Sequence, residues 1–423
     1  IKFEFSEVFP GKVKDSSPRI NDASVEIDGT YNVIHGTRHL HDTWDAKRPT
    51  GHYAPPGELI TITIPTNHVD KGMSVMIGAH ERDHSNLSQT NRFLRISNRF
   101  GLSTEETKIV NPFGGGIYIL VPEGSNFGYF DITINGAVKS PYFSTREGKG
   151  TDLSVWQDEL AEQSVKWVDI ESDKFMTTLP IKVIDGISPG SINLSDPRLM
   201  MEKWDEVADG FNYVAGRPQE RSRAEYIISD TRIPDGGYGT GYPAVYDDDD
   251  NGMMAIALLR DEPQKIGGVV TMFHEMGHLE WHPTLGNAVE SIVHLPAVYI
   301  WNKYYDLPLD TAFKYSAFQK LTMDQTTIDW IITDNFRNNI KISCDPTMNP
   351  SVCHEVRYQH RGHAIYIEIA DLFGWEAVYN THKVFYDEWK FNTQKDWGFM
   401  GSINGNAITD DELILAASNA NNV

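Results

Sequence analysis

The residues best suited to chemistry in this chain form the segment His274-Glu275-Met276-Gly277-His278. On a helix, positions i and i+4 share a face, so the imidazoles of His274 and His278 can reach one metal ion. The carboxylate of Glu275 then lies beside that ion, where it can accept a proton from a bound water. The pattern is typical of zinc-dependent hydrolases, provided that a third ligand follows.

Glu290 is the best candidate for the third ligand. It opens a segment of apolar periodicity, residues 287–305, which follows a turn marked by proline and glycine. The eleven residues between His278 and Glu290 are enough for a helix end, a reversal and one turn of a returning helix. Two histidines and one carboxylate leave a coordination position open, as in catalytic zinc sites. The sequence therefore predicts one zinc ion per chain.

Two other clusters resemble metal sites but fit them poorly. Residues 247–252 match the first half of a calcium loop, but the twelfth position is Leu258, where a bidentate glutamate is required, so an acidic solvated turn is favoured. His354, His360 and His363 are six and three residues apart, a spacing that does not place all three on one face. A surface or substrate-facing cluster is the favoured reading of these histidines.

Composition excludes several classes of protein. The chain has 423 residues, enough for two or three domains, and its 37 basic and 59 acidic residues give a formal net charge of −22. We expect no nucleic-acid partner, because no basic stripe is present. No run of 18 apolar residues occurs, so we also expect no membrane span. A hydrophobic content of 40% without low-complexity tracts indicates a folded globular protein.

Cysteine usage favours an oxidising compartment. Cys344 and Cys353 lie in a loop rich in proline and asparagine, where a disulfide would close a ring of ten residues. Such a bridge would add about 2–3 kcal/mol to the free energy of unfolding. We therefore expect a secreted protein, with two free thiols in a cytosolic enzyme as the alternative.

The pattern of apolar residues predicts the elements that position the metal site. Residues 1–150 read as β-rich, with strand-like alternation and turns at the spacing expected of a β-sandwich. Residues 151–180 read as a helix or a charged connection, and 181–186 as a strand. A helix is expected from Pro197 to Gly216, and the chain reads as mostly helical after residue 265. The prediction is an α+β fold with a domain at 1–150 and a catalytic domain at 151–423.

The chain resembles the M60 (enhancin-like) family of zinc metallopeptidases, within the gluzincin group. The resemblance rests on the histidine motif, on Glu290 within NAVESIVHLPAVY, and on distant segments such as TGHYAPPGELITITIP and ISDTRIPDGGYGTGYP. It covers about residues 50 to 380 and implies a β-sandwich-like part followed by a thermolysin-like catalytic part. It also implies cleavage of O-glycosylated proteins such as mucins. Two departures leave substrate preference open: Leu279-Glu280-Trp281, and His294 where an asparagine is common.

The resemblance assigns further roles. Glu275 is expected to act as the general base. Gluzincins commonly stabilise the oxyanion with a tyrosine or a histidine, for which His360, His363 and Tyr366 are the candidates. His294 lies one turn after Glu290 on the same helical face, so we expect it to support a metal ligand.

The glycine-rich loop 235–246 predicts one wall of a substrate groove. Tyr238, Tyr242 and Tyr246 offer flat faces with a hydroxyl group, which suit sugar stacking and hydrogen bonding. For each tyrosine, simple packing at a strand end is an equally weighted alternative. Two other functions stay open as well: an inactive family member that binds glycans or acts as a scaffold, and a zinc hydrolase acting on a non-peptide substrate.

Overall fold

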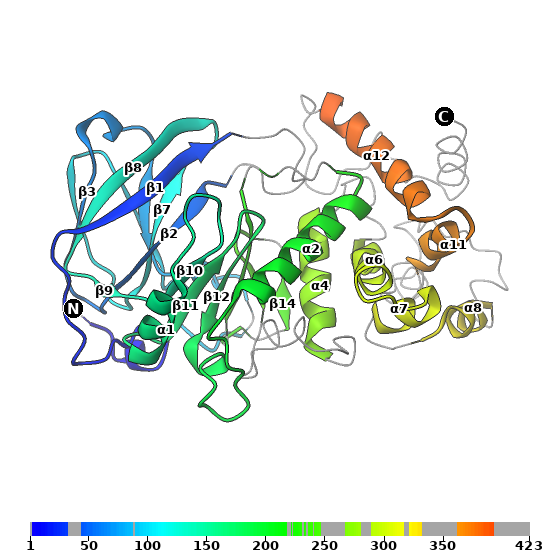
Figure 1. The fold of residues 1–423 in the computed structure, drawn as a ribbon, viewed down its shortest axis with the longest axis horizontal. Helices are drawn as coiled ribbons and strands as arrows, with labels where there is room; N and C mark the ends of the chain where they lie inside the picture. The colour runs from blue at the N-terminus through cyan, green and yellow to red at the C-terminus, as the bar shows by residue number, and fades with distance from the viewer. Residues whose placement is uncertain are drawn as a thin grey trace. The chain divides into compact units, whose positions relative to one another are not determined.

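The computed structural model describes residues 2–32, 44–87, 89–217, 221, 223–230, 232–233, 236–239, 241–246, 267–280, 289–316, 321–331 and 362–392. The chain divides into two compact units (Figure 1). The first unit comprises Ile1–Ile34, His41–Asp205 and Arg221–Leu259, and the second comprises His35–Leu40, Glu206–Glu220 and Arg260–Val423.

Two antiparallel sheets in the first unit pack face to face as a sandwich. One has the order β1 (Ala23–Tyr31), β8 (Ser125–Asn135), β3 (Ile60–Thr63) and β6 (Glu106–Ile109). The other has the order β5 (Asn98–Gly101), β4 (Ser74–Ile77), β7 (Gly115–Val121), β2 (Ala46–Ala54) and β9 (Val138–Lys139). Alternate residues such as Ile60 and Ile62 of β3, and Ile117 and Ile119 of β7, point into one shared core, because side chains alternate across a strand.

A third sheet of six strands completes the first unit. Its order is β10 (Tyr142–Ser144), β11 (Trp167–Glu171), β12 (Phe175–Pro180), β13 (Glu225–Ser229), β15 (Ala244–Tyr246) and β14 (Gly237–Tyr238). Helix α1 (Leu153–Glu162) precedes β11 and starts at Asp152, whose side chain accepts a hydrogen bond from the Ser154 amide. Met176, Tyr226 and Ile228 of this sheet pack with Tyr118 and Leu120 on the outer face of β7.

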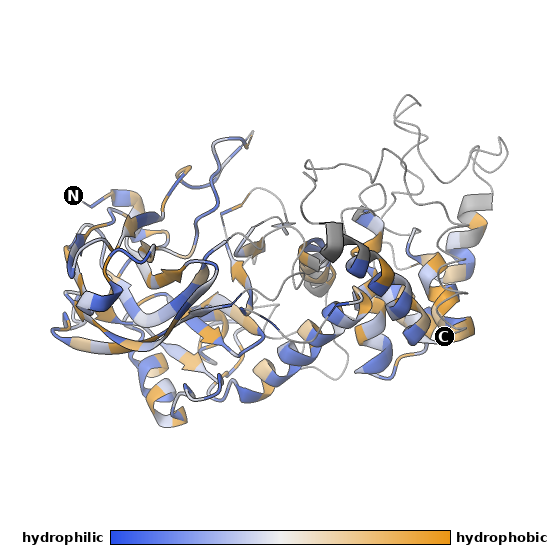
Figure 2. Ribbon diagram, turned by 90° about the horizontal axis from the view of Figure 1, so that it is seen from above, coloured by the Kyte–Doolittle hydropathy of each residue, from blue (hydrophilic) through white to orange (hydrophobic). Residues whose placement is uncertain are grey.

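The second unit is helical over its described residues. Its helices are α4 (Gly267–Glu280), α5 (Val289–Ile292), α6 (Leu295–Lys303), α7 (Leu309–Ser316), α8 (Met323–Ile331), α11 (Ala364–Phe373) and α12 (Trp375–Asn392). Helix α2 (Arg198–Val214) carries residues of both units. Figure 2 shows hydrophobic and hydrophilic residues together along these helices, as expected for amphipathic helices that bury one face.

Aromatic contacts hold the second unit around the end of α2. The Tyr213 ring stacks on Tyr299 of α6 and on Tyr379 of α12, with centroid distances of 5.0 and 4.9 Å. Gly216, at a φ of 71°, ends the helix. The backbone at Lys383 approaches Gly216 so closely that a Cβ there would lie 2.2 Å from the Lys383 nitrogen, so only glycine fits.

The fold class predicted from sequence is confirmed, and some local predictions are wrong. The α+β class, the β-rich N-terminal half and the helix ending at Gly216 are as expected. Residues 151–180, read as a helix or a charged connection, contain helix α1 and then the hairpin β11–β12, which was not predicted. Residues 181–183 form a 3-10 helix and not a strand. Within the described residues no helix is long and apolar enough to cross a membrane.

Candidate metal centre

Helix α4 presents both motif histidines from one face and is anchored by aromatic contacts. His274 and His278 are one turn apart, and their rings meet edge to face at 4.7 Å. Phe273, next to His274 in the chain, packs between Phe211 of α2 and Trp301 of α6, at centroid distances of 5.8 and 5.3 Å. The helix is therefore fixed by buried aromatic contacts next to its histidines.

Gly277 allows the third candidate ligand to approach. A Cβ at Gly277 would lie 2.5 Å from the Val293 carbonyl oxygen and 2.6 Å from the Val293 Cβ. Any larger residue would push α4 away from the turn between α5 and α6. Glu290 lies on α5, one helical turn before Val293. The glycine of the motif thus sets the spacing between the histidines and the glutamate.

The three ligand atoms converge. The Nε2 atoms of His274 and His278 are 3.0 Å apart, and the Glu290 Oε2 atom lies 3.1 and 3.7 Å from them. A tetrahedral zinc ion with bonds of about 2.0–2.1 Å requires ligand atoms about 3.3 Å apart. The observed separations bracket that value. Among the described residues this trio is the group able to hold a metal ion.

The charge states fit a metal ligand set. Burial, together with the neighbouring His274, lowers the pKa of His278 to about 4, despite the opposing effect of Glu290. The imidazole is therefore neutral near pH 7 and has a free lone pair to donate. The Glu290 side chain is 48% exposed, so this edge of the site is open to solvent. Two imidazoles and a carboxylate suit zinc among the common metals.

Behind the ligands lies a row of buried imidazoles. His294 Nε2 is 3.1 Å from His274 Nδ1, the ring nitrogen that faces away from Glu290 and His278. The His294 ring lies 5.7 Å from the His363 ring, and His363 Nε2 lies 3.0 Å from the Ser316 hydroxyl of α7. Both His294 and His363 are fully buried. A contact at Nδ1 fixes the ring orientation of a ligand histidine, which is the role expected for His294.

The structure describes the surroundings of the other sequence candidates. His363 lies in the buried row, and Tyr366 is buried against the His382 ring at 5.1 Å. Tyr242 is buried in the first unit, where its ring packs against Tyr226 at 5.7 Å. That placement favours the packing alternative for Tyr242, and the burial of Tyr246 favours it there too.

Tyr238 is half-buried, and the Arg82 guanidinium lies 3.5 Å from its ring centroid. Five further predictions fall outside the described residues: His354, His360, Cys344, Cys353 and the acidic turn at 247–252.

Two features of the site were not anticipated from sequence. The Ser316 contact joins residues 47 positions apart, which no local pattern can indicate. The Gly277 contact could have been found, because a glycine inside a helix usually marks a close approach. In this chain it lies between the two ligand histidines.

Comparison with protein families gives matches over most of the chain. A model of the N-terminal domain of M60-like peptidases matches residues 20–135. A model described as peptidase M60, enhancin and enhancin-like, matches residues 136–402, which is more than half of the 423 residues.

Curated relatives include TRPM8 channel-associated factors. The rat TRPM8 channel-associated factor 3 is 28% identical over 274 residues, which is 62% of this chain and 28% of that protein. The human TRPM8 channel-associated factor 2 is 25% identical over 265 residues, covering 61% of this chain and 27% of that protein. This chain thus spans little more than a quarter of their length.

Solved structures with the same fold include two bacterial metallopeptidases. IMPa from Pseudomonas aeruginosa, in complex with an O-glycopeptide, matches with a TM-score of 0.59 and 15% identity over 96% of this chain and 49% of that one. ZmpB from Clostridium perfringens matches with a TM-score of 0.57 and 14% identity over 95% of this chain and 75% of that one. At these identities the likeness shows the fold alone. The family models carry the assignment, and by them this chain belongs to the M60 family of enhancin and enhancin-like peptidases.

Proposed function

We propose that this protein is a zinc metalloendopeptidase that hydrolyses peptide bonds in O-glycosylated, mucin-like proteins. The observation that carries the proposal is the convergence of two imidazole nitrogens and one carboxylate oxygen, with a second carboxylate next to them in the chain. Family membership supports peptide hydrolysis as the reaction class.

Each residue of the site has its own proposed role. His274, His278 and Glu290 would hold the zinc ion, and His294 would orient His274. When bound, zinc supplies Lewis-acid activation of a water and polarises the scissile carbonyl. Glu275 accepts the proton of the attacking water and passes it to the leaving amine. Glu275 is part-exposed, so a substrate can reach it. The oxyanion donor is proposed among His360, His363 and Tyr366.

The glycoprotein part of the proposal rests on relatives. The IMPa structure holds an O-glycopeptide, and a second one is described in complex with T-antigen. We extend that substrate class to this chain, with Tyr238 as the remaining aromatic candidate from the glycine-rich loop. A secreted location, with Cys344 and Cys353 joined, belongs to the same proposal because mucin-type substrates are extracellular.

A paired cleavage assay tests the function. The protein is incubated with a mucin-type glycoprotein and with the same glycoprotein after enzymatic removal of its O-glycans. We expect fragments from the first substrate, none after chelation of zinc, and none from a Glu275→Gln variant. Equal cleavage of both substrates would leave an ordinary zinc endopeptidase. Absence of cleavage with zinc bound would reject the enzymatic function.

The names of the curated relatives favour a second candidate, a binding or scaffold protein. Those relatives are described as channel-associated, and this chain matches them over 62% of its length. Such a protein would bind its partner without cutting it, and Glu275→Gln would change nothing. Against this candidate, the motif retains both histidines, the base and Glu290, whereas decayed enzymes usually lose one of them.

A further inference from the structure

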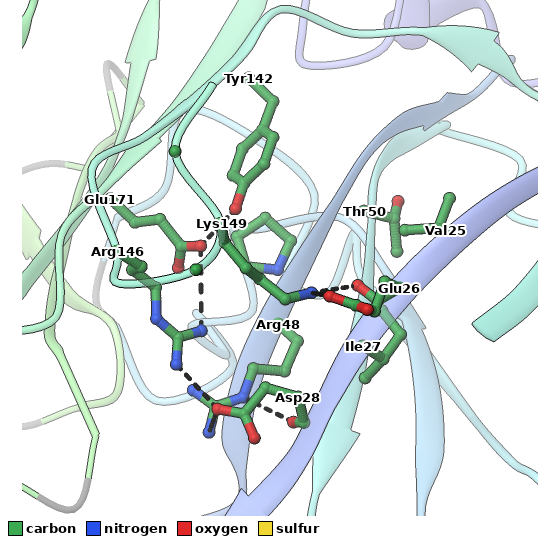
Figure 3. Close-up of a pocket in the computed structure, with 13 residues that line it drawn as sticks. Val25, Glu26, Ile27, Asp28, Arg48, Thr50, Tyr142, Arg146, Lys149 and Glu171 are labelled. Carbon is green, nitrogen blue, oxygen red and sulfur yellow. Dashed lines mark hydrogen bonds and ion pairs between the residues drawn. The ribbon is translucent and has the colours of Figure 1, made fainter. Parts of the chain in front are cut away.

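The cavity drawn in Figure 3, of about 240 Å³, is lined by charges that neutralise one another. The Asp28 carboxylate lies 2.7 Å from an Arg146 nitrogen and 3.3 Å from an Arg48 nitrogen. The Lys149 ammonium lies 3.4 Å from the Glu26 carboxylate. These ion pairs join β1 to β2 and to the loop before α1, which explains the charges of this cavity without a ligand.

A much smaller cavity lies between the sandwich and the six-stranded sheet, and all of its lining residues are buried. The centre of a water molecule has about 10 Å³ of room in it, and about 10–15 Å³ is enough for one molecule. Tyr53 of β2 and Tyr118 of β7 line it from the sandwich, and Asp169 of β11 and Thr178 of β12 line it from the sheet. His80, on the loop after β4, completes the polar part of the wall.

The Tyr53 hydroxyl is a buried donor that lacks an acceptor. The residue is 1% exposed, and its oxygen has no hydrogen-bond partner among the described residues. Burial, together with the charge of Asp169, raises the pKa of Tyr53, so the hydroxyl keeps its proton. Buried hydroxyl groups are nearly always hydrogen-bonded, because a buried donor without a partner costs free energy. An acceptor from outside the described residues is therefore needed.

Two acceptor atoms belong to residues of the same wall. The Tyr118 and Thr178 hydroxyls both donate to Oδ1 of Asp169, at 2.8 and 2.5 Å, and no described residue donates to Oδ2. His80 Nε2 lies 3.0 Å from the Ser229 carbonyl oxygen, which can only accept, so Nε2 carries the proton. Burial lowers the pKa of His80 and keeps the ring neutral, which makes its Nδ1 atom an acceptor.

Gly116 keeps this cavity open. It pairs with Tyr53 across β2 and β7 and lies in the cavity wall. A Cβ at Gly116 would come 2.8 Å from the Tyr118 hydroxyl oxygen. That is closer than packed atoms approach, so any side chain here would displace the hydroxyl that bonds Asp169.

A packing defect is the alternative explanation of the cavity. Voids that stay dry inside proteins are lined by apolar groups. This wall instead holds tyrosine and threonine hydroxyls, a carboxylate and an imidazole. Its chemistry is therefore that of a hydrated site.

We propose that the cavity binds one water molecule, which accepts a hydrogen bond from Tyr53 and donates to Asp169 and His80. Three partners are typical of a buried water. The water would join β2 of the sandwich to β11 of the six-stranded sheet, beside the direct bond from Tyr118 to Asp169. The site uses no residue of the metal centre, so it holds whether or not the protein is a peptidase.

A crystal structure of the full chain, at a resolution that shows ordered water, tests the site directly. We expect one density peak in the cavity, about 2.5–3.0 Å from the Tyr53 hydroxyl oxygen and from Asp169 Oδ2. A dry cavity would overturn the proposal. So would a peak with about six oxygen ligands at about 2.3–2.6 Å, because those are the contacts of a calcium ion.

Removal of the donor tests the site in solution. Tyr53→Phe keeps the ring and deletes the hydroxyl, so the amplitude of oxygen-17 magnetic relaxation dispersion should fall by that of one long-lived water. Tyr129→Phe is the matched control, because its ring is exposed on β8, and it should leave the amplitude unchanged. The parent's amplitude in folded Tyr53→Phe would contradict the hydrogen bond from Tyr53 and overturn the proposal. If Tyr53→Phe does not fold, the density in the parent protein decides.

Discussion

The roles proposed for Glu275 and its neighbour His274 differ, and substitution can distinguish them. Replacing Glu275 by glutamine keeps the size of the side chain but removes the proton acceptor. We expect zinc content and thermal unfolding to match the parent protein while kcat falls by several orders of magnitude, because the base acts only on the way to the transition state. Near-normal turnover of Glu275→Gln would show that another residue is the base.

His294 should control how tightly the metal is held. Its Nε2 atom contacts His274 Nδ1 at 3.1 Å, so His294→Ala would leave the ligand ring free to turn. Loss of such a supporting contact typically costs about 10–100-fold in metal affinity. Competition with a zinc-sensitive dye would measure the change.

His382→Ala is the matched control for His294→Ala. His382 is a buried histidine of the same unit whose Nδ1 atom bonds the Val214 carbonyl oxygen. We expect His382→Ala to lower stability and keep metal affinity. Equal affinity in the two variants would argue against a positioning role for His294.

At the residue scale, the sequence predicts candidate ligands that lie close together in the chain. It misses contacts between residues that are far apart in the chain. His274 and His278 follow from helical spacing alone, and Glu290 from an apolar period that resumes twelve positions after His278. The Ser316–His363 contact depends on how α7 and α11 pack, which the sequence does not encode as a spacing.

At the scale of elements, the approach of α5 to α4 depends on a glycine. Gly277→Ala would ordinarily stabilise a helix by about 0.5–1 kcal/mol. Here the new methyl group would overlap Val293, so we expect lower stability and weaker zinc binding. Zinc content after dialysis, with the unfolding midpoint, measures both effects.

Gly101→Ala is the control for this substitution. Gly101 has open space where a Cβ would lie, so the added methyl group should change neither the zinc content nor the unfolding midpoint. If Gly277→Ala retains its zinc as Gly101→Ala does, the helix contact does not set the ligand spacing.

The hairpin β11–β12 was not predicted because charged residues stand among its apolar ones. The hairpin β11–β12 carries Asp169 and Glu171 among its apolar residues, and both are buried. A charged residue in a window normally indicates exposure, so the segment read as a helix or a connection. Both carboxylates are buried because residues outside their own strand donate hydrogen bonds to them. Asp169 accepts from Tyr118 and Thr178, and Glu171 accepts from Tyr142.

At the scale of the whole molecule, Asp169 links the sandwich to the six-stranded sheet. Its carboxylate accepts hydrogen bonds from Tyr118 of β7 at 2.8 Å and from Thr178 of β12 at 2.5 Å. Burial raises the pKa of Asp169 to about 6, despite these two hydrogen bonds. The folded state therefore holds this proton more tightly than the unfolded state, in which the pKa is about 3.9.

Stability from Asp169 should thus fall as pH rises. The contribution of the Asp169 proton to the free energy of unfolding is complete below about pH 4. It is lost as the pH rises through about 6, which lowers the free energy of unfolding by roughly 3 kcal/mol for a shift of about two pKa units. Asp169→Asn carries no such proton, so its free energy of unfolding should lack this fall. Urea unfolding between about pH 4 and pH 7 measures the difference. Asp131→Asn, at an exposed position of β8, should retain the parent's profile.

The short helix that carries Glu290 has a consequence for local stability. Helix α5 has four residues, too few to be held by its own backbone hydrogen bonds. A metal shared with α4 would act as a cross-link, closing the chain between His278 and Glu290. Removing the metal would remove that cross-link, so the amide protons of this turn should exchange faster with solvent. Hydrogen exchange with and without zinc would measure how much of the order of this turn comes from the metal.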